Sequence, residues 1–175
     1  MDSFRIQGFV EFTLKRGKKI IRKFKRKNLI TNLGLETLAK GLLIGMGSGV
    51  IIGDVYIGLG SDDGLPFVPS PSITDLALAN ELPDINIPRK IVAAGDMVLD
   101  SNHAVLEVEF ATDEGNPDVP FNLVDAGVFW DGATVVRNTG VLVSRVLIVP
   151  IFPKDPTCDI LNVRWIYEFN RKTTT

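Results

Sequence analysis

The sequence contains very few of the residues from which catalytic and metal sites are usually built. Among its 175 residues there is one histidine, His103, and one cysteine, Cys158. A single cysteine excludes an intramolecular disulfide, and one histidine with one cysteine cannot supply the usual zinc ligands. A Ser-His-acid triad would depend on His103, and no Gly-x-Ser-x-Gly motif is present to hold the serine. We therefore expect no metal, no cofactor and no enzymatic activity.

Long apolar runs are also missing. The longest, around residues 141–152, is interrupted by Ser144, Arg145 and Pro150, so it is too short and too polar to span a membrane. The first residues lack the charged-then-apolar order of a secretory signal, and we expect synthesis in a cytoplasm. The hydrophobic content of 45% is high enough for a packed core. A length of 175 residues suits one domain.

Charge is nearly balanced overall but very uneven along the chain. Residues 1–27 contain ten Lys or Arg and two acids, which gives +8, so the net charge of −2 leaves −10 on the remainder. Such a segment is typical either of a solvated hairpin rim or of a contact with an acidic protein surface. Nine of the ten cations lie between Lys15 and Lys27. Nucleic-acid binding is disfavoured, because Phe24 is the only aromatic residue in that stretch and its position predicts that it points inward. The expected assembly contact comprises Lys18, Lys19, Arg22, Lys23, Lys25, Arg26 and Lys27.

Alternating apolar residues predict several half-buried strands. The first covers residues 4–14, with a bulge at Gly8, and a turn at Arg16-Gly17 leads into a returning strand over 19–29. On the returning strand, Ile20 and Phe24 share the face that should point inward, and Lys23, Lys25 and Lys27 lie on the other face, toward water. In the last strand, Trp165 and its same-parity neighbours should point inward toward the apolar residues of 104–110. Further strands are expected over residues 55–60, 90–99, 103–111, 124–130, 134–137, 141–149 and 163–169.

One segment changes to the helical period. Leu35, Leu38, Ala39 and Leu42 have the spacing i, i+3, i+4, i+7, which predicts a helix capped by Thr31 or Asn32. Residues 74–82 are expected to form two shorter helical turns that end at Pro83. About eight strands and one substantial helix predict a mainly β fold, either a β-sandwich or a flattened barrel with the helix at one end. The single domain, 1–175, then consists of a basic hairpin (1–30), the helix (31–46) and a β-rich body (50–175).

Other motifs that could hold a ligand are better interpreted as structural. The glycine-rich residues 45–49 follow a helix, whereas a phosphate loop precedes one, so we interpret them as a helix exit. Residues 61–64 lack the remaining ligands of a calcium loop and are expected to form a turn. His103 is expected in an exposed loop, and Cys158, between Thr157 and Asp159, is expected to be inert because no basic group beside it stabilises a thiolate. Glu107 and Glu109 alternate with apolar residues and are expected to be solvated.

Five short segments, taken in order, resemble small structural proteins of tailed bacteriophages, the group described as tail-fibre-like or minor virion proteins. They are NLITNLGL (28–35), YIGLG (56–60), DLALANEL (75–82) followed by Arg89, DAGVFW (125–130) and VRW (163–165). The resemblance covers residues 27–169 and implies an oligomeric virion component of the tail, baseplate, collar or capsid surface. It carries over no catalytic residue. Because a long repetitive shaft is missing, a compact adaptor or decoration subunit fits this length better than a whole fibre.

An alternative remains open at this point. The chain could be a receptor- or carbohydrate-binding module of a tail fibre, with a receptor on the host surface as its partner. Such a module would use exposed aromatic residues on loops, and the candidates are Phe67 and Trp130. The mass in solution distinguishes the two hypotheses, since an assembly subunit should multimerise.

Overall fold

The computed structural model describes residues 3–45, 53–62, 69–100, 102–116, 122–152 and 154–172. Their strands are β1 (Ser3–Arg16), β2 (Lys19–Ile30), β3 (Tyr56–Ser61), β4 (Arg89–Ile91), β5 (Met97–Asp100), β6 (His103–Phe110), β7 (Leu123–Trp130), β8 (Val141–Phe152) and β9 (Asp159–Lys172). The helix is α1 (Asn32–Gly45), and two 3-10 turns are η1 (Asp84–Asn86) and η2 (Ala94–Asp96).

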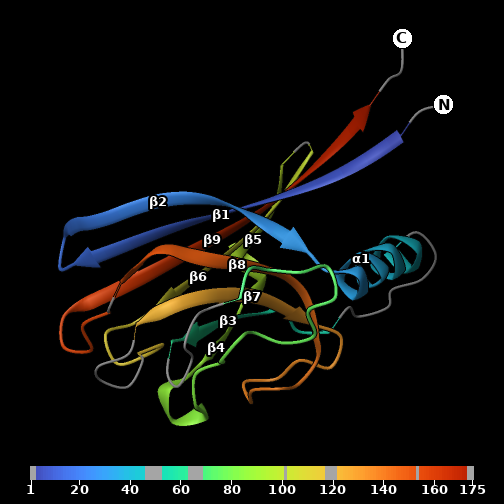
Figure 1. Cartoon of the computed structure of the whole chain (residues 1–175). Helices are drawn as coiled ribbons and strands as arrows, with labels where there is room; N and C mark the ends of the chain where they lie inside the picture. The colour runs from blue at the N-terminus through green and yellow to red at the C-terminus, as the bar shows by residue number, and fades with distance from the viewer. Residues whose placement is uncertain are drawn as a thin grey trace.

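The strands form one antiparallel sheet of nine strands, in the order β4-β3-β7-β8-β2-β1-β9-β6-β5. The sheet curls strongly into a half-barrel, and α1 lies at one end of it (Figure 1). The predicted mainly β fold, with a barrel-like shape and one substantial helix, is confirmed. No helix within the described ranges is long and apolar enough to cross a membrane.

The core lies inside the curl, and β1 and β9 supply much of it. Val10 of β1 pairs with Trp165 of β9, and Trp165 pairs in turn with Leu106 of β6. Trp165 is 0% exposed, and Tyr167 beside it is buried. The predicted inward direction of this strand's aromatic residues is therefore confirmed, with Phe169 partly buried at the edge of the core.

Gly8 does not form the predicted bulge. It pairs in regular register with Asn28 of β2 and Tyr167 of β9, and the irregularity in β1 falls between Leu14 and Lys15. A Cβ atom at Gly8 would lie 1.7 Å from the side-chain oxygen of Asn28. Any larger residue at this position would have to displace the Asn28 side chain, which lies across the backbone here.

Thr31 caps the helix, as predicted. Its side-chain oxygen accepts a hydrogen bond from the Gly34 N–H at 2.9 Å, which satisfies one of the unpaired donors of the first turn. The Thr31 N–H itself donates to the Val143 carbonyl at 3.0 Å, so the cap also ties the helix to β8. The helix continues through Gly41 and ends at Gly45; the rest of the glycine-rich segment lies outside the described residues.

The helical turns expected over residues 74–82 are absent, because this segment bonds to the sheet instead of to itself. The Ala79 N–H donates to the carboxylate of Asp125, and the carbonyl of Asn80 accepts from the Ser61 N–H at 2.9 Å. The Leu82 N–H donates to the Leu59 carbonyl. These backbone N–H and C=O groups already have hydrogen-bond partners in the sheet, so forming a helix would satisfy no further groups.

Two strand predictions were also partly wrong. Residues 134–137 form no strand: Asp131 and Gly132 do have positive φ angles, as the turn prediction requires, but β7 pairs with β8. The strand expected over 90–99 is divided between two partners. Arg89–Ile91 pairs with β3, and only Met97–Asp100 forms the hairpin with β6.

Candidate functional site

The β1–β2 hairpin carries the basic residues and projects along one side of the sheet (Figure 1). Its turn is made possible by Gly17, whose φ is +58°. Ile20 near the tip is 54% exposed, so its predicted inward direction is wrong. The Arg16 guanidinium holds the tip in place through two hydrogen bonds to the Asp159 carboxylate, at 2.9 and 3.2 Å.

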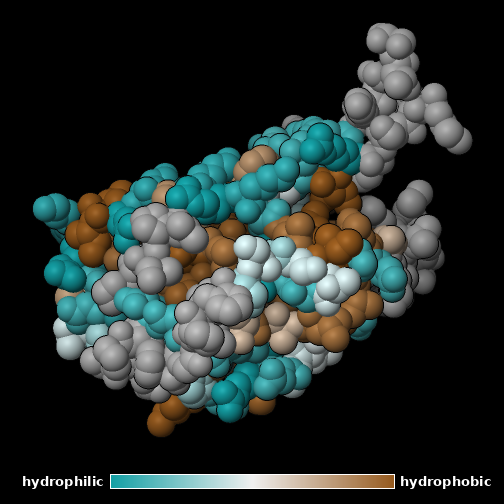
Figure 2. Space-filling model, in the orientation of Figure 1, coloured by the Kyte–Doolittle hydropathy of each residue, from teal (hydrophilic) through white to brown (hydrophobic). Residues whose placement is uncertain are grey.

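The basic residues of the hairpin do not share one face. Lys23, Lys25 and Lys27 are exposed on one face of β2, and Lys18 and Lys19 are exposed near the turn. Figure 2 shows hydrophilic side chains along the rim where Figure 1 draws this hairpin.

Arg22 and Arg26 are half-buried on the other face of the hairpin, with their guanidinium carbons 5.8 and 5.4 Å from the centre of the Phe24 ring. Phe24 stacks on Phe12, with the ring centres 5.0 Å apart. These two arginines therefore lie on the hairpin's other face, so the seven residues of the predicted contact do not share one surface.

Part of the positive charge is balanced within the chain. Across β2, β1, β9 and β6, the face that bears the lysines carries an alternating row of Lys25, Glu11, Arg164 and Glu107. Successive charged atoms in this row are 3.6, 3.6 and 3.8 Å apart. Such exposed pairs each contribute only about 0–1 kcal/mol. Among the described residues, no carboxylate forms an ion pair with Lys23 or Lys27.

One edge of β2 is open along most of its length. Pairing with β8 is confined to Leu29 with Arg145 and Ile30 with Ser144, at the end of β2. Toward the hairpin turn the two strands diverge (Figure 1). Peptide groups in a strand point alternately to its two sides. Because the Thr31 N–H points toward β8, those of Lys23, Lys25 and Lys27 point the same way. The described part of the chain places no strand beside them.

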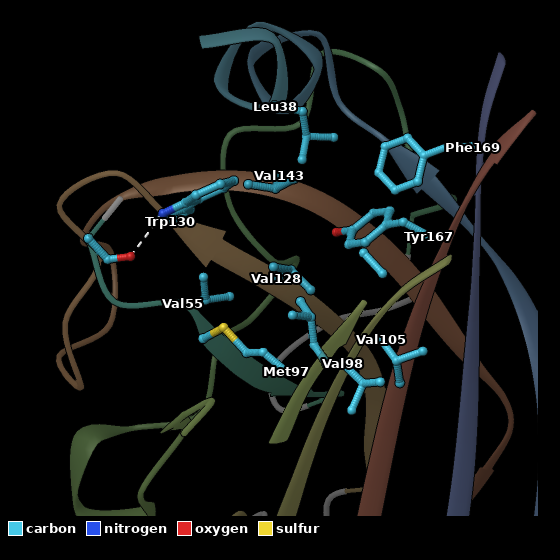
Figure 3. Close-up of a pocket in the computed structure, with 13 residues that line it drawn as sticks. Leu38, Val55, Met97, Val98, Val105, Val128, Trp130, Val143, Tyr167 and Phe169 are labelled. Atoms are coloured by element: carbon cyan, nitrogen blue, oxygen red, sulfur yellow. Dashed lines mark hydrogen bonds between the residues drawn. The ribbon is translucent and has the colours of Figure 1, made fainter. Parts of the chain in front are cut away.

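A second feature is an apolar cavity of about 360 Å³ at the α1 end of the half-barrel (Figure 3). Leu38 of α1 lies above it, and its walls include Val55, Met97, Val128, Trp130, Tyr167 and Phe169. The Trp130 indole N–H donates to the Gly53 carbonyl at 2.9 Å, and the Tyr167 hydroxyl lies 2.6 Å from that of Ser144. Trp130 therefore contributes a cavity wall, whereas Phe67, the other predicted ligand-binding aromatic, lies outside the described residues.

Two buried ion pairs were not predicted from the sequence. Arg145, which interrupts the apolar run of β8, is buried and lies 2.8 Å from carboxylate oxygens of both Asp125 and Asp75. Arg89 is buried against Glu81, and its guanidinium carbon lies 3.7 Å from the centre of the Phe129 ring. These pairs fasten residues 75–81 to the sheet.

Burial is the main influence on the pKa of Asp125, which it raises. In the sequence, the one signal that could have indicated the pair of Arg145 and Asp125 was Arg145 itself, a charged residue within an otherwise apolar strand.

Lys154 is a further buried charge that is held in structural contacts. Lys154 donates to the carbonyls of Ala111 and Thr112 and to the Asn116 side chain, at 2.6 to 3.0 Å. Burial is the main cause that lowers the pKa of Lys154 to about 8.

The sole histidine and the sole cysteine show no catalytic pairing. His103 is half-buried at the start of β6, with its Nε2 atom 3.6 Å from a Glu168 oxygen, so it does not lie in an exposed loop. Arg16 does lie near Cys158, contrary to expectation, but desolvation still raises the pKa of that thiol. No cluster of metal-ligating side chains occurs within the described residues.

Comparisons of this chain with protein-family models, with curated proteins and with solved structures find no match in any of the three. A functional conclusion therefore depends on the residues described above.

Proposed function

We propose that this chain is a non-enzymatic structural subunit of a bacteriophage virion, and that it acts by assembling with other virion proteins and with copies of itself. Its place would be the tail, the baseplate, the collar or the capsid surface. The ordered segments described above, from NLITNLGL to VRW, suggest the virion. The contact geometry of the hairpin supports the assembly role.

The observation that carries the proposal is the basic, open edge of β2. Lys23 and Lys27 are exposed and have no ion-pair partner in the described ranges, and the neighbouring Lys25 is only partly balanced by Glu11. Like charges on one short strand repel one another, and an acidic partner surface would relieve that repulsion. An edge whose peptide groups point outward also invites pairing with another strand. Both properties favour a protein contact at this place.

The terminal strands supply a second observation. β2 accompanies β1 only from Gly8 onward, and β6 accompanies β9 only as far as Glu168. Beyond these points β1 and β9 continue together as a two-stranded ribbon that projects past the body (Figure 1). A ribbon of two strands is marginally stable alone in water, so docking against a neighbouring subunit would stabilise it.

The buried charges support a structural role as well. Arg145, Arg89 and Lys154 are each satisfied by carboxylates or carbonyl groups that hold loops to the sheet. Perturbed groups gathered in an open cleft would have indicated catalysis, whereas the cavity near α1 is apolar. The Trp130 indole N–H is bonded to the Gly53 carbonyl, so it does not act as a donor to a sugar hydroxyl in this arrangement.

The test is whether the protein is part of a particle. Virus particles purified from cells that express the chain should contain it in many copies, and antibody labelling in electron micrographs should place it on the particle. The variant Lys23→Glu, Lys27→Glu should fold normally but enter particles poorly. Lys23→Arg, Lys27→Arg, which keeps the charge, and Arg137→Glu, an exposed position on another loop, should enter normally. Abundant soluble protein with none in purified particles would overturn the proposal.

A further inference from the structure

The open edge of β2 has a counterpart in the same chain. β5 is the last strand of the sheet on the other side, and among the described strands it pairs only with β6. Met97 and Val98 are 38% and 50% exposed, although both are apolar. Two exposed acids flank its edge: Asp96, the last residue of the preceding turn η2, and Asp100, the last residue of the strand. β5 is therefore a short, acidic edge, and β2 is a basic one.

The register of the sheet shows that the two edges present their charges on the same face. Asp100 lies opposite His103, His103 opposite Glu168, and Val98 opposite Val105. The next positions on these strands pair Glu107 with Arg164, then Arg164 with Glu11, and Glu11 with Lys25. Since residues directly opposite each other share a face, the face that bears Lys23, Lys25 and Lys27 also bears Val98 and Asp100.

The peptide groups decide the direction in which the two edges can pair. The Phe169 N–H donates to the Asn102 carbonyl, so the peptide groups of His103 point away from β9 and toward Asp100. Alternation then leaves those of Met97 and Leu99 pointing outward from β5. The outward peptide groups of β5 thus belong to Met97 and Leu99, which alternate with Val98 and Asp100, the residues of its charged face. On β2, by contrast, they belong to the lysines of the charged face themselves.

Two conditions must hold: the charged faces of both strands must lie on the same side of the sheet, and the outward peptide groups must meet partners. Only a parallel arrangement meets both. In a parallel ladder, a residue whose peptide groups point toward the partner strand lies opposite a residue whose groups point away from it. Parity allows more than one register, and the one that brings both outer lysines to acids places Lys25 opposite Val98, Lys27 opposite Asp100, and Lys23 beside Asp96 at the end of η2. The Lys25 N–H would donate to the Met97 carbonyl, and the Lys25 carbonyl would accept from the Leu99 N–H. An antiparallel arrangement would place the lysines opposite Met97 and residue 99 and would break the continuity of the face.

We infer that the β2 edge of one copy pairs in parallel with the β5 edge of a second copy, so that the sheet continues head to tail from subunit to subunit. This inference deepens the proposed function and rests on it. Two β2 edges would bring lysines together, and two β5 edges would bring aspartates together, so only the mixed pair is attractive. A contact between two different surfaces of the same chain produces rings or filaments rather than a closed two-fold dimer. The contact is short, so we expect it to be weak in dilute solution and effective where many copies are concentrated.

The test measures the mass of the full chain by sedimentation velocity over a range of concentrations at low ionic strength. We expect the parent to self-associate, and the association to fade at about 1 M salt, where the Debye length is about 3 Å. Lys23→Glu, Lys27→Glu and, separately, Asp96→Lys, Asp100→Lys should each lower the apparent association constant about tenfold or more. Circular dichroism and thermal unfolding confirm that each variant is folded.

Mixing the two variants provides the decisive measurement. In the first variant, acids on β2 would meet the acids of β5, and in the second, lysines would meet lysines, so neither should associate alone. An equal mixture allows the acidic β2 edge of one variant to meet the basic β5 edge of the other, so association should return on mixing. A second measurement tests the register without charge reversal. In a Cys158→Ser background, Lys25→Cys with Val98→Cys should form an intermolecular disulfide ladder on oxidation, and Lys25→Cys with Thr74→Cys should not.

The outcomes separate this inference from the proposed function. If the mixture fails to associate, or if only the lysine changes lower self-association, then the β2 edge does not pair with β5 and the inference is wrong, although a particle role survives. A parent that stays monomeric at every concentration, yet is present in purified particles, leads to the same conclusion. Self-association with the expected mixing behaviour, but no protein in particles, supports the contact and overturns the virion proposal.

Discussion

Trp165→Ala is the sharpest test of how this fold is held together. Trp165 is fully buried, between Val10 of β1 and Leu106 of β6, in the middle of the curled sheet. A tryptophan side chain buries about 150–250 Å², which at about 25 cal/mol per Å² corresponds to about 4–6 kcal/mol. Alanine recovers part of this area, and core truncations of this kind cost about 3–5 kcal/mol. We expect a loss in that range, a large share of the about 5–15 kcal/mol that stabilises an ordinary domain.

Urea denaturation followed by circular dichroism gives the change in the free energy of unfolding. Fluorescence gives a second probe, since the chain has two tryptophans and Trp130 remains as the reporter. Trp130→Ala is the matched control: its side chain is half-buried at a cavity wall, so its loss should cost clearly less. A cost below about 1 kcal/mol for Trp165→Ala, the size typical of a minor core change, would refute the placement of Trp165 in the core.

The remaining predictions concern charge and chemistry. Arg145→Met should destabilise the protein by about 3–5 kcal/mol, because it leaves the carboxylate of Asp125 buried without its partner; adding Asp125→Leu should recover much of the loss in a urea titration. The pKa of Lys154 is lowered to about 8 from 10.5, so the folded state binds fewer protons there and the free energy of unfolding should rise between about pH 8 and 10.5. Lys154→Met should remove that rise. Joint His103→Ala and Cys158→Ala changes should leave particle incorporation intact, and a loss with retained fold would contradict a non-enzymatic role.

Much of the fold follows from local patterns in the sequence. The alternating apolar residues of β1 and β9 predicted the inward direction of Trp165, because side chains alternate between the two faces of any strand. Thr31 as the helix cap was also predicted, since capping depends on neighbouring residues alone. The turn at Asp131-Gly132 has the expected positive φ angles. The strand predicted after it is nevertheless absent, because β7 pairs with the longer strand β8.

The errors share a physical cause, which is that distant parts of the chain decide where backbone groups are satisfied. Residues 74–82 look helical by themselves, but hydrogen bonds to Asp125 and Ser61 connect them to the sheet. Likewise Arg89–Ile91 pairs with β3 and takes no part in the hairpin that was predicted for it. Propensity is a weak preference that such tertiary contacts override.

The same division applies to the candidate site. The sequence alone determined that the cations gather on one hairpin, and that alternate lysines of β2 face water. Only the tertiary structure decided that Arg22 and Arg26 turn toward Phe24, that Glu11 partly balances Lys25, and that β8 leaves β2 after Arg145. Charge composition is a local property of the chain. Which charges remain uncompensated, and which strand edges remain open, depends on the partners that folding brings alongside.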